Sequence, residues 1–103
     1  MPEIRGSDVK NVVIACEAGM GSSVLLTTQM KQRLQPYGVE VAHLAVNRIE
    51  DNPDVVLCHV GLEARARQQA PSSVVLAFNM FMGDPVFDQL EEALRDDKVL
   101  SSR

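Results

Sequence analysis

The chain has 103 residues, 46% of them hydrophobic, and a formal net charge of −4. This size suits one domain with one core, and the apolar content excludes a disordered chain. The acidic balance argues against a general nucleic-acid binder. The two cysteines do not suggest a disulfide framework, no window is long and apolar enough to span a bilayer, and Met1–Lys10 lacks the apolar part of a secretion signal. Together these features predict a soluble protein of a reducing compartment.

Apolar runs and helical periodicities alternate along the chain. The sequence predicts strands at Asn11–Cys16, Val39–Val46, Asp54–His59 and Ser73–Phe78. It predicts helices from Val24 to about Leu34, over Leu62, Ala66 and Ala70 up to Pro71, and from Pro85 over Phe87, Leu90 and Leu94. Ser22 and Asp84 are the expected N-caps of the first and third helices.

Strands that alternate with helices predict an α/β fold. We expect a three-layer sandwich around a four-stranded, mostly parallel sheet with strand order 2-1-3-4 in chain numbering, which is a truncated doubly wound sheet. The connector Asn47–Pro53 is short for a parallel crossover, which usually takes about a dozen residues, so an antiparallel placement of one strand stays an alternative. We expect a single domain over 11–96, a loose polar lead-in over 1–10 and a frayed polar tail over 97–103.

The candidate site is the junction between the first strand and the first helix. It reads Cys16-Glu17-Ala18-Gly19-Met20-Gly21-Ser22-Ser23. Such a junction directs backbone N–H groups and the positive end of the helix dipole at one point, which favours anions and lowers the pKa of a thiol. We therefore predict that Cys16 is a nucleophile for a phosphoryl group, held by the amides of residues 18–23 and by the two serine hydroxyls. The predicted strand order places this loop beside His59.

Protein tyrosine phosphatases resemble this loop in having a cysteine, five residues and then an arginine. Here Ser22 occupies the arginine position, so the bidentate support of a guanidinium is absent. No aspartate general acid can be assigned either. Hydrolysis should be poor, and a phosphocysteine would persist long enough to be passed on. A small phosphatase is the third-ranked alternative.

The run from Cys16 to Ser23 resembles the active loop of the IIB components of the bacterial sugar phosphotransferase system (PTS), and the mannitol-type branch is the most similar. The similarity extends through the third strand with His59 to the Asn79–Phe81 region and covers most of the chain. Glu17 replaces the aspartate usual in the family, and Val60 stands where the mannitol group tends to carry arginine. Ascorbate- and galactitol-type IIB proteins share the fold, so the sugar stays open.

The resemblance implies a phosphotransferase. Cys16 would accept phosphate from the phosphohistidine of a IIA domain and pass it to a sugar held by a membrane IIC domain during uptake. The protein would then be cytoplasmic and peripheral to the inner membrane through its IIC partner. The alternative is a IIB-like regulatory module whose Cys16 phosphorylation signals sugar availability. No cofactor is expected, and no metal, because no cluster of residues has metal-ligand spacing.

Several further residues allow two interpretations. His59 either steadies the phosphate or contacts the partner, or it is a structural histidine bonded to nearby backbone. Cys58, inside the third strand, is interpreted as core packing. The apolar stretch from Phe78 to Met82 either closes the core or forms a docking patch for the IIA or IIC partner. Asp51 and Asp54 are interpreted as turn residues.

Overall fold

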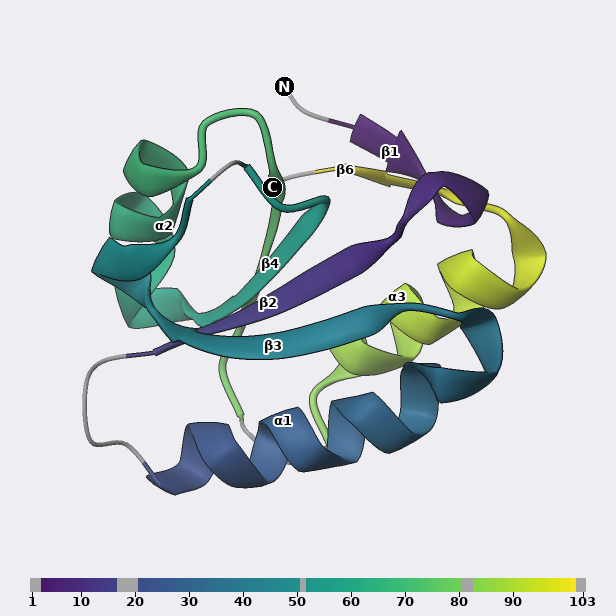
Figure 1. Cartoon of the computed structure of the whole chain (residues 1–103), viewed down its shortest axis with the longest axis horizontal. Coiled ribbons are helices and arrows are strands. Elements are labelled where there is room, and N and C mark those ends of the chain that lie inside the picture. The colour runs from purple at the N-terminus through teal and green to yellow at the C-terminus, as the bar shows by residue number, and fades with distance from the viewer. Residues whose placement is uncertain (1–2, 17–20, 51, 81–82, 102–103) are drawn as a thin grey trace.

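A four-stranded parallel sheet forms the centre of the molecule, in the order β3-β2-β4-β5 (Figure 1). The structure, a computed structural model, describes residues 3–16, 21–50, 52–80 and 83–101. The strands of this sheet are β2 (Asn11–Cys16), β3 (Glu40–Ala45), β4 (Val55–His59) and β5 (Val74–Phe78). All three neighbouring pairs are parallel. The predicted order 2-1-3-4 is confirmed, and the antiparallel alternative is wrong.

Helices cover both faces of the sheet and complete the predicted three-layer sandwich. The α-helices of the described chain are α1 (Gly21–Leu34), α2 (Glu63–Gln69) and α3 (Pro85–Asp96). Short 3₁₀ helices are η1 (Gly6–Asp8), η2 (Gln35–Tyr37), η3 (Val46–Arg48) and η4 (Val60–Leu62). One face packs against α1 and α3, and the other packs against α2 and η3.

Burial on both faces explains the continuous apolar run of β2. Val12 and Ile14 belong to the core beneath α1 and α3, whereas Val13 and Ala15 belong to the core beneath α2. Successive side chains of a strand point to opposite faces, so a strand covered on both sides needs apolar residues at every position.

In its described residues, the connection from β3 to β4 crosses over β2 without an α-helix. Val46 and Ile49 are each 2% exposed and fill the core beneath α2. The Gln69 side chain of α2 donates from Nε2 to the carbonyl oxygens of Asn47 and Ile49, at 3.2 and 3.1 Å. These bonds satisfy two carbonyl groups of the connector that a crossover α-helix would have paired internally.

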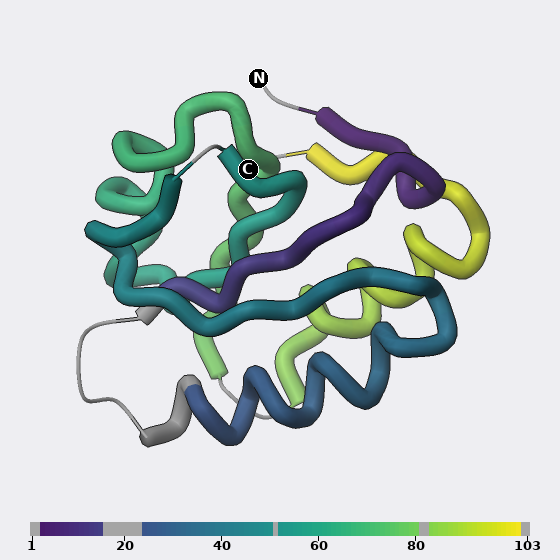
Figure 2. Tube along the Cα trace, viewed as in Figure 1, coloured from purple at the N-terminus to yellow at the C-terminus, as the bar shows by residue number. Residues whose placement is uncertain are grey.

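The two ends of the described chain pair with each other, so the expected loose lead-in and frayed tail are wrong for these residues. β1 (Glu3–Arg5) and β6 (Val99–Ser101) form an antiparallel two-stranded sheet, and Figure 2 shows the two segments side by side. Asp97 accepts hydrogen bonds from the Arg5 guanidinium and from the Ser7 backbone N–H, both at 3.0 Å. Two strands of three residues carry too little periodicity to be predicted from sequence.

The helix starts agree with the sequence in one case and differ in the other. Asp84 is the N-cap of α3, with Pro85 at the first helical position, as predicted. α1 begins at Gly21, so Ser22 lies in its first turn. The prediction that Ser22 is the N-cap of this helix is therefore wrong. Helix ends are the least predictable part of an element because the cap is defined by local backbone geometry.

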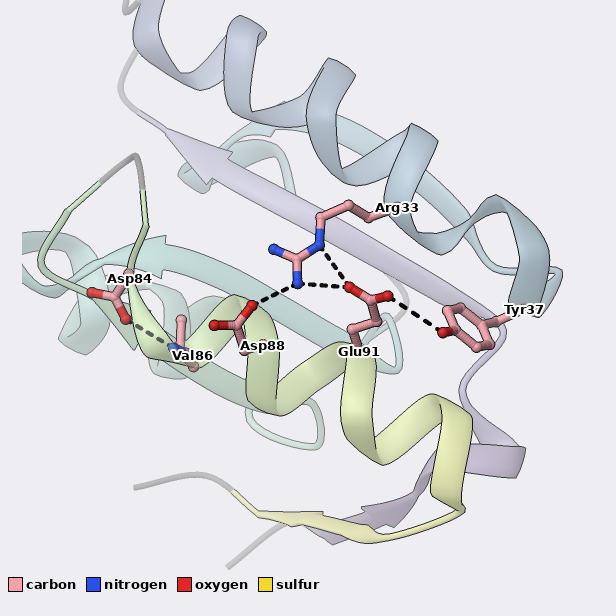
Figure 3. Close-up of polar contacts among 6 residues, drawn as sticks. All are labelled: Arg33, Tyr37, Asp84, Val86, Asp88 and Glu91. Carbon is pink, nitrogen blue, oxygen red and sulfur yellow. Dashed lines mark hydrogen bonds and ion pairs between the residues drawn. The ribbon is translucent and has the colours of Figure 1, made fainter.

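A cluster of charged groups joins α1 to α3 (Figure 3). The Arg33 guanidinium donates to Glu91 and to Asp88, each at 2.8 Å. Tyr37 donates from its hydroxyl to Glu91 at 3.4 Å. Arg33 therefore pairs within the chain, and its charge serves helix–helix packing.

Candidate functional site

The carboxyl ends of β2 and β4 meet at one edge of the sheet. β2 ends at Cys16 and β4 ends at His59, and Ala15 of β2 pairs in register with Cys58 of β4. Adjacent strands lie about 4.8 Å apart, so the backbones of Cys16 and His59 are neighbours, as the sequence predicted. Cys16 pairs with Ala45 of β3 on its other side.

This edge contains the switch point of the sheet. From β2 the chain runs to β3 on one side and then crosses to β4 on the other. Open α/β sheets bind ligands at this position, outside the carboxyl ends of the strands. Of the predicted loop, Glu17, Ala18, Gly19 and Met20 lie outside the described residues. Residues 21–23 form the first turn of α1, whose backbone N–H groups have no partner within the helix.

His59 has a bond to nearby backbone, as one of its two interpretations predicted. Its Nδ1 accepts a hydrogen bond from the Gly61 N–H at 3.1 Å. This bond uses the lone pair on Nδ1, so the neutral ring carries its proton on Nε2. The ring stands edge-on to Phe78 of β5, with centroids 6.0 Å apart. A role of His59 toward phosphate or a partner stays a prediction.

Cys58 is a core residue, as predicted. It has no exposed surface. Burial, and to a smaller extent the charge of Glu63, raises the pKa of its thiol to about 12. A thiol held in the protonated form is a poor nucleophile, so Cys58 is not a candidate nucleophile.

Within the apolar stretch from Phe78 to Met82, one residue fits core closure and another stays available to a partner. Phe78 is 1% exposed and packs against Phe87 of α3, with ring centroids 5.3 Å apart, so it closes the core. Met80 is 52% exposed. Phe81 and Met82, which the sequence also assigned to this segment, lie outside the described residues.

Asp84 makes more contacts than the N-cap that the sequence predicted. One carboxylate oxygen accepts from the Val86 N–H at 2.9 Å (Figure 3). The other accepts from the N–H groups of Asn79 and Met80, at 2.9 and 3.3 Å. Burial opposes ionisation of this carboxyl, but the three N–H donors outweigh it and lower its pKa. The Asp-Pro pair signalled the cap, whereas nothing in the sequence signalled the link back to β5.

Several exposed apolar side chains lie on the segments that follow the carboxyl ends of β2, β4 and β5. Of the large hydrophobic residues that are exposed in the described chain, four follow the carboxyl end of a strand: Val24, Leu25, Val60 and Met80, at 47–55%. We call these four residues the apolar rim. Val24 and Leu25 lie outside the buried stripe of α1, and sequence analysis did not single them out. A hollow of about 460 Å³ adjoins the rim, between the end of β5 and the start of α3, and Met80 and Asp84 line it.

The described residues contain no group of three or more His, Cys, Asp and Glu side chains arranged to hold a metal ion. Within the same residues, no helix combines the length and apolar character needed to cross a membrane.

These features define an α/β protein with a cysteine at the switch point of a parallel sheet, directly before a helix N-terminus. A sequence profile described as "PTS system, Lactose/Cellobiose specific IIB subunit" matches residues 11–92. The chain therefore belongs to the IIB family of the sugar phosphotransferase system, as its loop indicated.

Similar curated proteins are mannitol-specific PTS components. The EIICB component of Geobacillus stearothermophilus is 34% identical over 84% of this chain. The EIICBA component of Vibrio cholerae is 34% identical over 85% of the chain, and a cryptic EIICB component of Escherichia coli is 36% identical over 82%. The matched part spans only 19%, 14% and 18% of these three relatives.

Proposed function

We propose that this chain is a phosphoryl carrier in sugar uptake, with Cys16 as the residue that carries the phosphoryl group. The observation that carries the proposal is the position of Cys16 at the switch point, ahead of the α1 N-terminus, in a chain of the IIB family. A helix N-terminus favours both the thiolate and the bound anion.

The transfer takes place in two displacements at phosphorus. The Cys16 thiolate attacks a phosphohistidine of a IIA domain, so that an S–P bond forms, the N–P bond breaks and the electron pair returns to the imidazole nitrogen. A sugar hydroxyl in a membrane IIC domain then attacks the phosphocysteine. An O–P bond forms, the S–P bond breaks, the thiolate returns and the hydroxyl proton is released.

The names of the relatives support this pair of partners, since they join C and B, or C, B and A, in one component. The protein would accordingly work at the cytoplasmic surface of the inner membrane, bound to its IIC partner. The apolar rim favours the docking of a partner around Cys16, because its side chains are exposed on the segments that follow β2, β4 and β5 and are available for contact. His59 belongs to this site as a secondary residue.

Phosphoryl uptake from a histidine-phosphorylated IIA domain of the same organism tests the proposal. The wild type should take up close to one acid-labile phosphate per chain, and Cys16→Ser should take up none. Cys58→Ala is the matched control and should behave as the wild type, because its thiol is buried. Equal uptake by Cys16→Ser would show that another residue is the acceptor.

A second measurement separates transport from the alternative of a regulatory module. Phosphorylated protein is mixed with membranes that contain the IIC partner and, in turn, mannitol, ascorbate or galactitol. Loss of the phosphate to the sugar is the outcome expected of a carrier. A phosphocysteine that is formed but never passed to any sugar would favour the regulatory module.

A further inference from the structure

We infer that Asp84 is a positioning residue for phosphoryl transfer, because it holds Met80 of the apolar rim in place for the phosphoryl-donor partner. This inference rests on the proposed function. Asp84 is 7% exposed and bridges two segments: it caps α3 through Val86, and it accepts the backbone N–H groups of Asn79 and Met80.

Met80 is less buried than Phe78, so we infer that the bridge matters more for its position than packing does. The side chain is 52% exposed and adjoins the open hollow beside α3. By contrast, Phe78, two residues earlier, is anchored in the core against Phe87. The Asp84 carboxylate therefore anchors the backbone of Asn79 and Met80, and Met80 is the apolar group that this anchor presents to a partner.

The position of this bridge connects it with Cys16. Phe78 ends β5 and contacts the ring of His59, which ends β4 next to β2. With strands about 4.8 Å apart, the end of β5 lies roughly 10 Å from the end of β2. A partner that reaches Cys16 therefore covers Met80 as well. A disordered Met80 would have to be ordered at docking, which weakens binding.

Two substitutions separate the bridge from the cap. Asp84→Ser retains a hydroxyl oxygen that can cap α3 but is too short to reach the Asn79 and Met80 N–H groups. Asp84→Asn has only one acceptor oxygen, so it can accept either from the Val86 N–H at the cap or from the Asn79 and Met80 N–H groups at the bridge. Asp97→Asn is the matched control, since Asp97 is also a carboxylate that accepts a backbone N–H, at the other end of α3.

The assay is the initial rate of phosphorylation by a histidine-phosphorylated IIA domain of the same organism, with the folded fraction counted from the phosphate taken up at saturation. We expect Asp84→Ser and Asp84→Asn to raise KM for the donor about three- to tenfold, with kcat changed less than about twofold. Asp97→Asn should leave KM unchanged. In a Met80→Ala background the effect of Asp84→Ser should fall below about twofold, because both substitutions remove the same contact.

Three outcomes would overturn the inference. The first is that Asp84→Ser has the same KM as the wild type. The second is that Asp84→Ser raises KM as much in the Met80→Ala background as in the wild type. The third is a Met80→Ala chain with the wild-type KM, a result that decides the question even if both Asp84 variants fail to fold. Failure of the proposed function is recognised separately, since the wild type would then take up no phosphate on Cys16.

Discussion

The two cysteines provide a direct test of the site, because each thiol is the control for the other. Cys58 has no exposed surface and a pKa of about 12. At pH 7.5 a thiol with the ordinary pKa of 9.0 is roughly 3% thiolate, whereas Cys58 is roughly 0.003% thiolate, a difference of about 1000-fold. Cys16, ahead of a helix N-terminus, is expected to ionise more readily than an ordinary thiol.

The assay is alkylation of the native protein by iodoacetamide at pH 7.5, followed by mass spectrometry of the peptides that contain each cysteine. We expect Cys16 to react at least about 1000-fold faster than Cys58, because alkylation requires the thiolate. In denaturant the two should react at similar rates. Cys16→Ser should leave the native chain almost unlabelled, and Cys58→Ala should leave the labelling rate of Cys16 unchanged.

Equal labelling of the two thiols in the folded protein would refute this reasoning. So would slow labelling of Cys16 in the native chain together with normal labelling in denaturant, since a protected thiol at this position cannot serve as the acceptor. Either result would also remove the main support for the proposed carrier.

The remaining predictions concern the link between the ends of the chain. A hydrogen bond from the Arg5 guanidinium, followed by one from the Ser7 N–H, lowers the pKa of Asp97 to about 2. The folded pKa lies below the unfolded value of about 3.9, so the stability from Asp97 is present above about pH 4 and is lost as the pH falls toward 2. Urea unfolding of Asp97→Asn should depend less on pH in this window than that of the wild type, and parallel curves would contradict the assignment. A Cβ on Gly6 would lie 1.9 Å from the Ala93 carbonyl oxygen, so Gly6→Ala should lower the free energy of unfolding by about 3 kcal/mol. Gly61→Ala, whose Cβ would meet its nearest neighbour at 3.4 Å, should change it by less than about 1 kcal/mol; similar unfolding midpoints for the two variants would contradict the close contact at Gly6.

The strand and the helix on either side of the predicted site were predictable because their signals are local. An apolar run that ends in Cys16 and a glycine-bearing loop before a helix identify a strand–loop–helix junction. The rules for parallel crossovers then limit the strand order, and they bring His59 beside that junction. Asp84 followed by Pro85 identified the start of α3 in the same way, since the cap depends on residues two positions apart.

The bridge from Asp84 back to the segment after β5 was not predictable from the sequence. Its bonds to Asn79 and Met80 depend on how the chain turns between β5 and α3, and the residue type is already explained by the cap. The exposure of Val24 and Leu25 was missed for a related reason. An apolar residue on a helix is buried or exposed according to what the rest of the fold places against it.

Sequence alone was enough to predict the alternation of strands and helices, the order of the four strands and the edge at which Cys16 lies, because these follow from apolar patterning and short-range chain connectivity. The tertiary structure alone decided the pairing of β1 with β6, the bridge made by Asp84 and the composition of the apolar rim. Each of these depends on where segments separated along the chain come to lie in space, and no local pattern encodes that information.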